Sequence, residues 1–310
     1  MNINRKKSLR SSLLLTLTAL IWGVAFVAQS EGMNYVGGFT FIATRYLIGG
    51  AVLIPCIFLL RKWNPEWKVL SAEAKKKKNR IGVIGGICCG VALCVASSLQ
   101  QFGIFYTTVG KAGFITALYI VIVPLFGLFL KKKVGLNIWI SVVIAAIGMY
   151  LLCITEGFSI GKGDFLVFLC AVAFSFHILI IDHFSPKADG VLISCVQFFT
   201  AGLIGTILML IYEQPTIQAI LSAWMPILYA GVLSSGVAYT LQVVAQKDID
   251  PTIASLIMSL ESVFSLLSGW VLLGQKLSNK ELFGCVLVFA AIILAQIPLE
   301  KVKKKVQINI

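Results

Sequence analysis

Two charged side chains lie inside long apolar stretches, and they are the residues most able to do chemistry. Glu261 lies deep in such a stretch, whereas every aspartate lies near the edge of one or between two. Removing a carboxylate from water favours its neutral, protonated form, which suits a group that carries a proton or faces a polar ligand. Glu261 could instead hold its helix to a neighbour through a hydrogen bond, and both interpretations stay open.

Arg45 is the only basic residue well inside an apolar stretch. Because arginine keeps its charge in proteins, it must pair with an acid, reach an aqueous boundary or face a water-filled space. Its planar guanidinium could bind a carboxylate or a phosphate group. A structural salt bridge, or a side chain that extends to the aqueous boundary, is the alternative.

Neutral polar and aromatic side chains accompany these two charges. Seven of them could line a cavity beside Arg45 and Glu261: Trp22, Tyr46, Gln100, Gln101, Tyr119, Tyr239 and Gln242. The alternative is that the amides join helices by hydrogen bonds and that the aromatic rings lie at membrane interfaces.

Motifs for catalysis and for cofactors are absent from the sequence. It has neither a GxxxxGK[ST] phosphate-binding loop nor an HExxH zinc motif. Two histidines, and eight cysteines without a CxxC pair, do not give the spacing of a metal site. Acidic residues are too sparse for the clustered acids of lipid-processing transferases. We therefore expect no enzyme activity, no metal and no cofactor.

The composition indicates a protein that lies in lipid. Of 310 residues, 58% are hydrophobic and 13% are charged, whereas a soluble domain carries about 25% charged residues. The net charge of +13 comes from short basic runs between apolar stretches, which is typical of cytoplasmic loops. We therefore expect the protein to be embedded in a lipid bilayer and not to bind a nucleic acid.

The apolar stretches have the length of membrane spans. A bilayer core of about 30 Å requires about 20 apolar residues in a helix. Ten stretches approach or reach that length: 12–29, 39–60, 81–105, 112–130, 135–154, 164–182, 190–212, 219–245, 252–273 and 281–298. Their uniform apolarity favours helices over the alternating strands of a barrel. Segment 61–80, which contains Lys75–Lys78, is expected to be a surface loop.

The distribution of lysine and arginine predicts that both termini are cytoplasmic. With the N-terminus inside, the tails 1–10 and 299–310 and the even-numbered loops hold most of the basic residues. The outer loops hold only Lys111, Lys162, Lys276 and Lys280. Basic residues concentrate in cytoplasmic loops, so we expect a multi-pass protein of the cell membrane with an uncleaved first span.

The chain repeats itself weakly but in order. Residues 95–100 (VASSLQ) match residues 237–242 (VAYTLQ), and in the same register 117–118 fall on 259–260. Earlier in the chain, 45–46 overlay 197–198 and 22–23 overlay 174–175. Residues 11–155 and 163–298 therefore correspond. Because five spans is an odd number, the prediction is an all-α membrane protein of ten transmembrane helices in two inverted five-helix repeats.

Several motifs resemble those of EamA-type permeases of the drug/metabolite transporter superfamily. They are residues 19–26 (ALIWGVAF), Arg45 in its span, 260–264 (LESVF) and 269–278 (GWVLLGQKLS). The family usually has proline where Ser262 stands and glutamate where Gln275 stands. The resemblance implies a ten-helix permease in which helices 1–4 and 6–9 enclose a central cavity, with metabolites, often exported, as substrates.

The sequence thus predicts a secondary-active or facilitative transporter. It would move a small metabolite, such as an amino acid, a nucleoside or a drug-like solute, by alternating access, with export as the expected direction. A proton is a candidate coupling ion. The alternative is a membrane helper protein without transport activity, or a passive channel.

Overall fold

The computed structural model describes residues 3–107, 109–129, 134–153, 161–273 and 278–295, and these residues contain helices and no strand. In lipid the backbone has to satisfy its own hydrogen bonds, which a helix does within one segment. The long helices are α1 (Ile3–Gly32), α2 (Gly38–Trp63), α4 (Ala72–Phe105), α7 (Leu136–Cys153), α8 (Lys162–Phe184), α9 (Gly190–Tyr212) and α15 (Asn279–Ala295).

Shorter helices complete the bundle. They are α3 (Pro65–Val69), α5 (Val109–Thr116), α6 (Tyr119–Phe129), α10 (Ile217–Ser222), α11 (Trp224–Leu228), α12 (Thr240–Gln246), α13 (Pro251–Met258) and α14 (Leu260–Leu273). Between α11 and α12 the chain forms wider, π-helical turns over Tyr229–Tyr239, labelled η1. The predicted span 219–245 is therefore assembled from α10, α11, η1 and α12 rather than from one regular helix.

Eight segments of the described chain are long and apolar enough to cross a membrane. They cover the first four predicted spans and the sixth to ninth. The fifth and tenth predicted spans coincide with the shorter apolar helices at Leu136–Gly148 and Leu282–Ala295, so the count of ten stays a prediction. Positions 130, 154 and 296–298 of the predicted spans, and the predicted tail 299–310, lie outside the described residues.

The predicted surface loop 61–80 is largely helical, which corrects the prediction. It contains the end of α2, the short helix α3 and the beginning of α4, and Lys75–Lys78 lie within α4. The Ser71 side chain caps α4 by accepting a hydrogen bond of 3.2 Å from the Ala74 N–H. Because lysine is a good helix former and the helix is capped, the helix extends beyond the apolar stretch.

Two of the predicted spans are broken at matching places. The first break separates α5 from α6 at residues 117–118, and the second separates α13 from α14 at Ser259. The overlay that places 117–118 on 259–260 brings these breaks together. At the second break, serine hydroxyls bond back to the helix: Ser259 Oγ donates to the Leu256 carbonyl and Ser262 Oγ to the Ser259 carbonyl, both at 2.7 Å. Such bonds back to the helix bend it.

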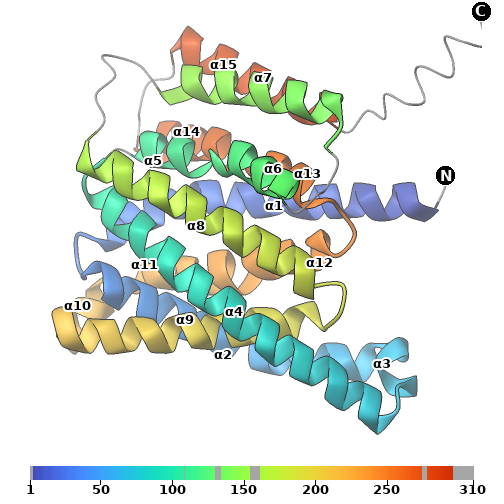
Figure 1. Ribbon diagram of the computed structural model, residues 1–310. Coiled ribbons are helices and arrows are strands. Elements are labelled where there is room, and N and C mark those ends of the chain that lie inside the picture. The colour runs from blue at the N-terminus through green and yellow to red at the C-terminus, as the bar shows by residue number, and fades with distance from the viewer. Residues whose placement is uncertain (1–2, 108, 130–133, 154–160, 274–277, 296–310) are drawn as a thin grey trace, which may run out of the picture.

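Helices at matching positions of the two halves pack against each other. Helix α2 packs along α9, and α7 packs along α15 at one side of the bundle (Figure 1). Helix α4 lies against α8 and α9, while η1 lies against α1 and α2. Gly90 lets α4 approach α9 closely, because a Cβ at this position would lie 2.5 Å from the Thr200 Cβ.

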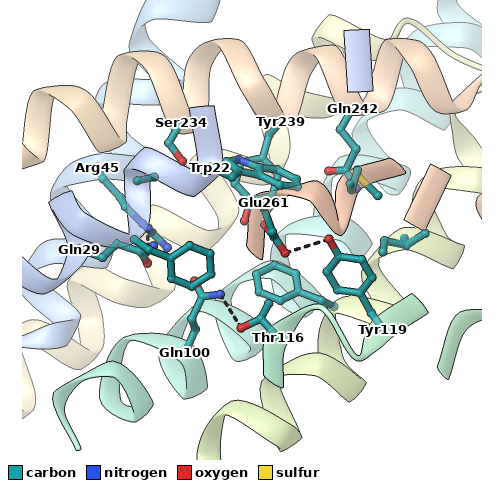
Figure 2. Close-up of a pocket in the computed structure, with 15 residues that line it drawn as sticks. Trp22, Gln29, Arg45, Gln100, Thr116, Tyr119, Ser234, Tyr239, Gln242 and Glu261 are labelled. Carbon is teal, nitrogen blue, oxygen red and sulfur yellow. Dashed lines mark hydrogen bonds between the residues drawn. The ribbon is translucent and has the colours of Figure 1, made fainter. Parts of the chain in front are cut away.

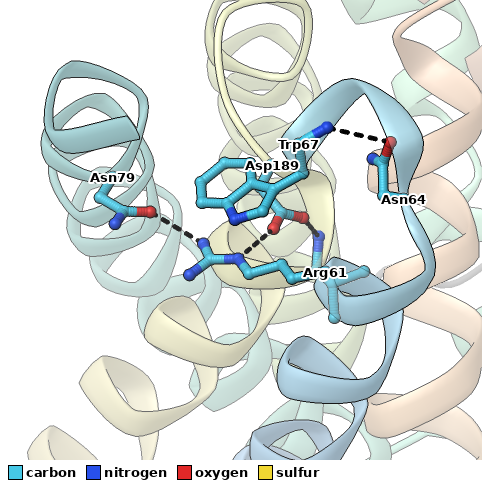
Figure 3. Close-up of polar contacts among 6 residues, drawn as sticks. Arg61, Asn64, Trp67, Asn79 and Asp189 are labelled. Carbon is cyan, nitrogen blue, oxygen red and sulfur yellow. Dashed lines mark hydrogen bonds and ion pairs between the residues drawn. The ribbon is translucent and has the colours of Figure 1, made fainter. Parts of the chain in front are cut away.

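The pair α2 and α9 is tied at both ends. At one end, the Glu213 carboxylate, just after α9, accepts hydrogen bonds of 2.8 and 2.7 Å from the Phe39 and Thr40 N–H groups at the beginning of α2. At the other end, the Arg61 guanidinium, near the end of α2, lies 3.0 Å from the carboxylate of Asp189, which precedes α9 (Figure 3). Each helix is thus bonded at its start to the end of the other.

Candidate functional site

A small cavity lies at the centre of the bundle, between the two halves of the chain (Figure 2). Its wall comes from α1, α2, α4, α5, α6, α8, η1, α12, α13 and α14. The lining residues are Trp22, Ala25, Phe26, Gln29, Arg45, Gln100, Thr116, Tyr119, Phe174, Ile178, Ser234, Tyr239, Gln242, Met258 and Glu261. The peripheral pair α7 and α15 contributes none of these residues.

The Glu261 carboxylate lies in the cavity wall, close to the break between α13 and α14. It is 4% exposed, and its Oε1 accepts a hydrogen bond of 2.8 Å from the Tyr119 hydroxyl. Tyr119 begins α6, directly after the other break, so the two interrupted spans meet through this bond. Helix interruptions in the middle of a membrane are tolerated where they line a cavity, and here they place a carboxylate there.

Arg45 enters the cavity from α2 and is held by neutral partners. Its Nη1 donates to Gln29 Oε1 and its Nη2 donates to the Tyr46 hydroxyl, both at 2.9 Å. The Tyr46 hydroxyl is also hydrogen-bonded to Ser97 Oγ. Arg45 is 2% exposed, and no carboxylate of the described residues forms an ion pair with it. A buried cation without a counter-ion is costly, so this position favours an anionic ligand.

Three buried polar atoms in the cavity wall have no hydrogen-bond partner among the described residues. They are Trp22 Nε1, Arg45 Nε and Gln242 Oε1. Buried polar groups are nearly always hydrogen-bonded, because leaving one unpaired costs about 1–3 kcal/mol. The wall therefore holds two donors and one acceptor that a bound solute could satisfy. By contrast, Gln100 Nε2 already donates to Thr116 Oγ1 at 3.2 Å.

Aromatic rings surround these polar atoms. The Trp22 and Tyr239 rings have centroids 4.5 Å apart, and Tyr239 lies edge-on to Phe198 at 5.9 Å. Tyr46 and Phe198, which the repeat overlay pairs, stack with an interplanar angle of 6° and centroids 5.7 Å apart. The Trp22 and Tyr239 rings line the cavity and give it apolar faces on which the flat or apolar part of a solute can pack, while Tyr46 and Phe198 lie behind them.

Seven of the nine predicted cavity residues line the cavity. They are Trp22, Arg45, Gln100, Tyr119, Tyr239, Gln242 and Glu261. The other two, Tyr46 and Gln101, lie behind the wall. Tyr46 supports Arg45 as described, and Gln101 Nε2 donates to the Gln29 backbone carbonyl at 3.1 Å.

Three further polar residues of the cavity wall, Gln29, Thr116 and Ser234, were not predicted from the sequence. Gln29 could have been found, because Trp22, Ala25, Phe26 and Gln29 follow the i, i+3, i+4, i+7 spacing of one helix face. Thr116 and Ser234 lack such a signal, since a lone hydroxyl in an apolar span more often bonds to its own helix. Ser234 faces the cavity from the π-helical turns of η1, which the sequence did not predict.

The cavity is narrow in this conformation. Its volume is about 30 Å³, which is the volume of roughly one water molecule in the liquid. A metabolite would need several times this space, so in this conformation the cavity is too narrow to hold one.

Comparison with known proteins identifies the family. The model of the EamA-like transporter family matches residues 9–154 and again residues 161–296. A curated uncharacterized transporter of Archaeoglobus fulgidus is 27% identical over 292 residues, 94% of this chain and 87% of that protein. The uncharacterized transporter YdfC of Bacillus subtilis is 23% identical over 97% of this chain and 95% of its own length.

The fold is also shared with a protein of known structure. A crystal structure with 17% sequence identity superposes with a TM-score of 0.74, over 92% of this chain and 96% of the other. Both halves of the chain match the same family model, which shows that the fold has two repeats. The eight apolar helices place it among multi-pass membrane proteins. This chain belongs to the EamA-like transporter family.

Proposed function

We propose that the protein carries a small polar solute across the cell membrane by alternating access, with the central cavity as the solute site. The observation that carries this proposal is the set of side chains that line one narrow central cavity. It holds a buried cation without an ion-pair partner among the described residues, a buried carboxylate, and unpaired hydrogen-bonding atoms. Membership of a transporter family supports it.

The proposed solute carries an anionic group and, at some distance from it, a cationic or hydrogen-bond-donating group. The anionic group would accept from Arg45 and from the Trp22 indole N–H, which has no other partner among the described residues. The donor would face Glu261 and the free Gln242 carbonyl oxygen. Amino acids have this combination of groups, and the Trp22 and Tyr239 rings would pack on an apolar side chain.

Alternating access would follow from two inverted five-helix repeats, the complete ten-span arrangement. Contacts between matching positions support it, since Tyr119 bonds to Glu261 and Tyr46 stacks on Phe198. Helix α1 begins and α15 ends at the same end of the bundle (Figure 1), as expected for an even number of spans. In this proposal both ends face the cytoplasm and Glu261 is the group that a coupling proton would occupy.

The direct test compares metabolites inside and outside cells that overproduce the protein with cells that lack it. Export predicts a solute that leaves overproducing cells faster, and that does not do so with the cavity variant Arg45→Gln. Thr206→Val is the matched control, because its hydroxyl bonds to its own helix at the Gly202 carbonyl and it does not line the cavity. A metabolite profile identical in all strains would contradict the proposal.

Cysteine labelling separates a carrier from a channel. Single cysteines are placed at positions 100 and 242 of a cysteine-free chain, with position 207, on an exposed part of α9, as the lipid-facing control. A carrier predicts labelling from one side at a time, shifted by solute. Labelling of both positions from both sides at all times would indicate a passive channel.

A further inference from the structure

A second pocket lies at the end of the bundle where α2 ends and α9 begins. Its volume is about 250 Å³, enough for several water molecules at about 30 Å³ each. It shares no lining residue with the central cavity. The wall comes from both repeats, since α2, α3 and α4 meet the connection of α8 to α9 and the end of α12. The function proposed above does not use this pocket.

One wall residue is a buried hydroxyl without a partner. Ser185, which follows α8, is 1% exposed, and its Oγ makes no hydrogen bond among the described residues. It lines the pocket. Serines at helix ends usually bond to a nearby backbone group. A buried polar group that does not is a candidate for contact with a ligand.

The pocket also carries an excess of positive charge. Lys78 on α4 and Lys247 after α12 line it together with Arg61 and Asp189. The Asp189 carboxylate is already satisfied, because it accepts from Arg61 Nε and from the Val191 N–H, both at 3.0 Å. The two lysines make no ion pair with a described residue. Three cations therefore face one carboxylate.

Arg61 is fixed rather than mobile, so it shapes the pocket. Its Nη2 donates to Asn79 Oδ1 at 2.8 Å, and its guanidinium lies 4.2 Å from the centre of the Trp67 ring (Figure 3). Trp67 itself is positioned by the capped turn of α3, in which the Trp67 backbone N–H donates to Asn64 Oδ1 at 3.3 Å. Arg61 is thus held in a fixed position in the pocket wall. The two lysines of the wall have no ion-pair partner among the described residues.

We propose that this pocket binds a phosphate group, which Lys78 and Lys247 neutralise and to which Ser185 Oγ donates a hydrogen bond. A phosphate has enough oxygens to accept from all three side chains at once. The pocket lies where the candidate spans Gly38–Trp63 and Gly190–Tyr212 end and begin, where a span would reach the lipid headgroups, so the phosphate would belong to a lipid headgroup or to a soluble phosphate ester. Because Lys78 is in the first repeat and Lys247 in the second, the bound group would hold the two repeats together at this end.

The test uses the purified full chain in nanodiscs. In the lipid arm, nanodiscs contain phosphatidylcholine and phosphatidylglycerol, and native mass spectrometry measures which lipid the protein retains. In the soluble arm, nanodiscs contain phosphatidylcholine alone, and glycerol phosphate is titrated while the thermal unfolding midpoint is followed. Preferential retention of phosphatidylglycerol alone assigns the site to lipid. A saturable rise of the midpoint assigns it to a soluble ester.

Matched variants locate the site. Lys78→Gln with Lys247→Gln removes two charges from the pocket, and Lys76→Gln with Lys77→Gln removes two exposed charges of α4 that do not line it. We expect the pocket pair, and Ser185→Ala, to weaken binding about tenfold, and the control pair to leave it within about twofold. Equal losses of binding in the pocket pair and in the control pair would overturn the proposal. So would a wild-type protein that neither retains phosphatidylglycerol preferentially nor shows a saturable rise of the midpoint with glycerol phosphate. Unchanged unfolding midpoints without probe show that the variants fold.

Discussion

The Tyr119 hydroxyl donates a hydrogen bond of 2.8 Å to the Glu261 carboxylate, and the two residues occupy matching positions in the two repeats. The same overlay that pairs residues 117–118 with 259–260 pairs 119 with 261. One repeat therefore supplies the acid and the other supplies its donor. The symmetry of the backbone is used to bring two different side chains together at the centre of the molecule.

Replacing Glu261 by glutamine tests its role as a proton carrier. The amide keeps the size of the side chain and can still accept from Tyr119, but it cannot take up a proton at physiological pH. We expect transport by Glu261→Gln in proteoliposomes to lose its dependence on a pH gradient. If the variant and the wild type respond equally to the gradient, Glu261 has no part in coupling.

Replacing Tyr119 by phenylalanine tests the hydrogen bond itself. The variant leaves the buried carboxylate without its partner, and we expect unfolding to become easier by about 1–3 kcal/mol. Chemical unfolding in a defined detergent measures this difference. The double variant with Glu261→Ala should lose less than the sum of the two single losses, because each single change already removes this contact. Strict additivity would show that the two side chains are not coupled.

Arg45 offers a test of solute charge. Arg45→Lys keeps the charge but loses the planar guanidinium that bonds Gln29 and Tyr46. Arg45→Gln loses the charge as well as the guanidinium. We expect the apparent affinity for an anionic or zwitterionic solute to fall about tenfold or more in Arg45→Gln and less in Arg45→Lys. Concentration-dependent uptake into proteoliposomes measures it. Equal apparent affinity of the wild type and both variants for the same anionic or zwitterionic solute would contradict a charge-binding role.

The contact of α4 with α9 offers a test of packing. A Cβ on Gly90 would lie 2.7 Å from the Gln197 backbone oxygen, as well as against Thr200. Since a backbone atom cannot rotate away, Gly90→Ala should destabilise the protein by about 1–3 kcal/mol. Gly110→Ala is the control, because a Cβ there would meet nothing within 4 Å. The thermal unfolding midpoints of the two variants should therefore differ, and equal midpoints would contradict the packing shown here.

The ties between α2 and α9 predict a further loss of stability. Glu213→Gln weakens the bonds to the first N–H groups of α2, which a negative charge favours at a helix N-terminus. We expect a cost of about 1 kcal/mol. Glu31→Gln is the control, because the Glu31 carboxylate is exposed and, among the residues that the structure describes, bonds only to the neighbouring side chains of Asn34 and Tyr35. Equal stability of the two variants would mean that the tie contributes nothing measurable.

Much of the architecture could be predicted from the sequence. Long apolar runs mark the segments that avoid water. Eight of the predicted spans therefore coincide with candidate membrane spans of the structure. Arg45 and Glu261 could be singled out because a charge in an apolar run needs a specific surrounding. The matching of Gln100 with Gln242 placed both amides in the predicted cavity, and both line the cavity of the structure.

Other features could not be predicted, because apolarity does not report the hydrogen-bond pattern of the backbone. The breaks at residues 117–118 and at Ser259 lie inside predicted spans and have no proline at the break. The π-helical turns over Tyr229–Tyr239 pack against α1 and α2, which are distant in the sequence. The capping residue Ser71 is the one sequence signal that Lys75–Lys78 belong to a helix, and it lies before the apolar run 81–105.

Because α2 and α9 are bonded at both of their ends, they form a strut of fixed length inside the bundle. Bending or sliding one against the other would break Arg61 from Asp189 or Glu213 from the first turn of α2. In the proposed transport cycle, the opening that admits a solute would come from helices that are already interrupted, α5 with α6 and α13 with α14. Tyr119 and Glu261 lie next to these interruptions, so the carboxylate proposed to face the solute would move with them.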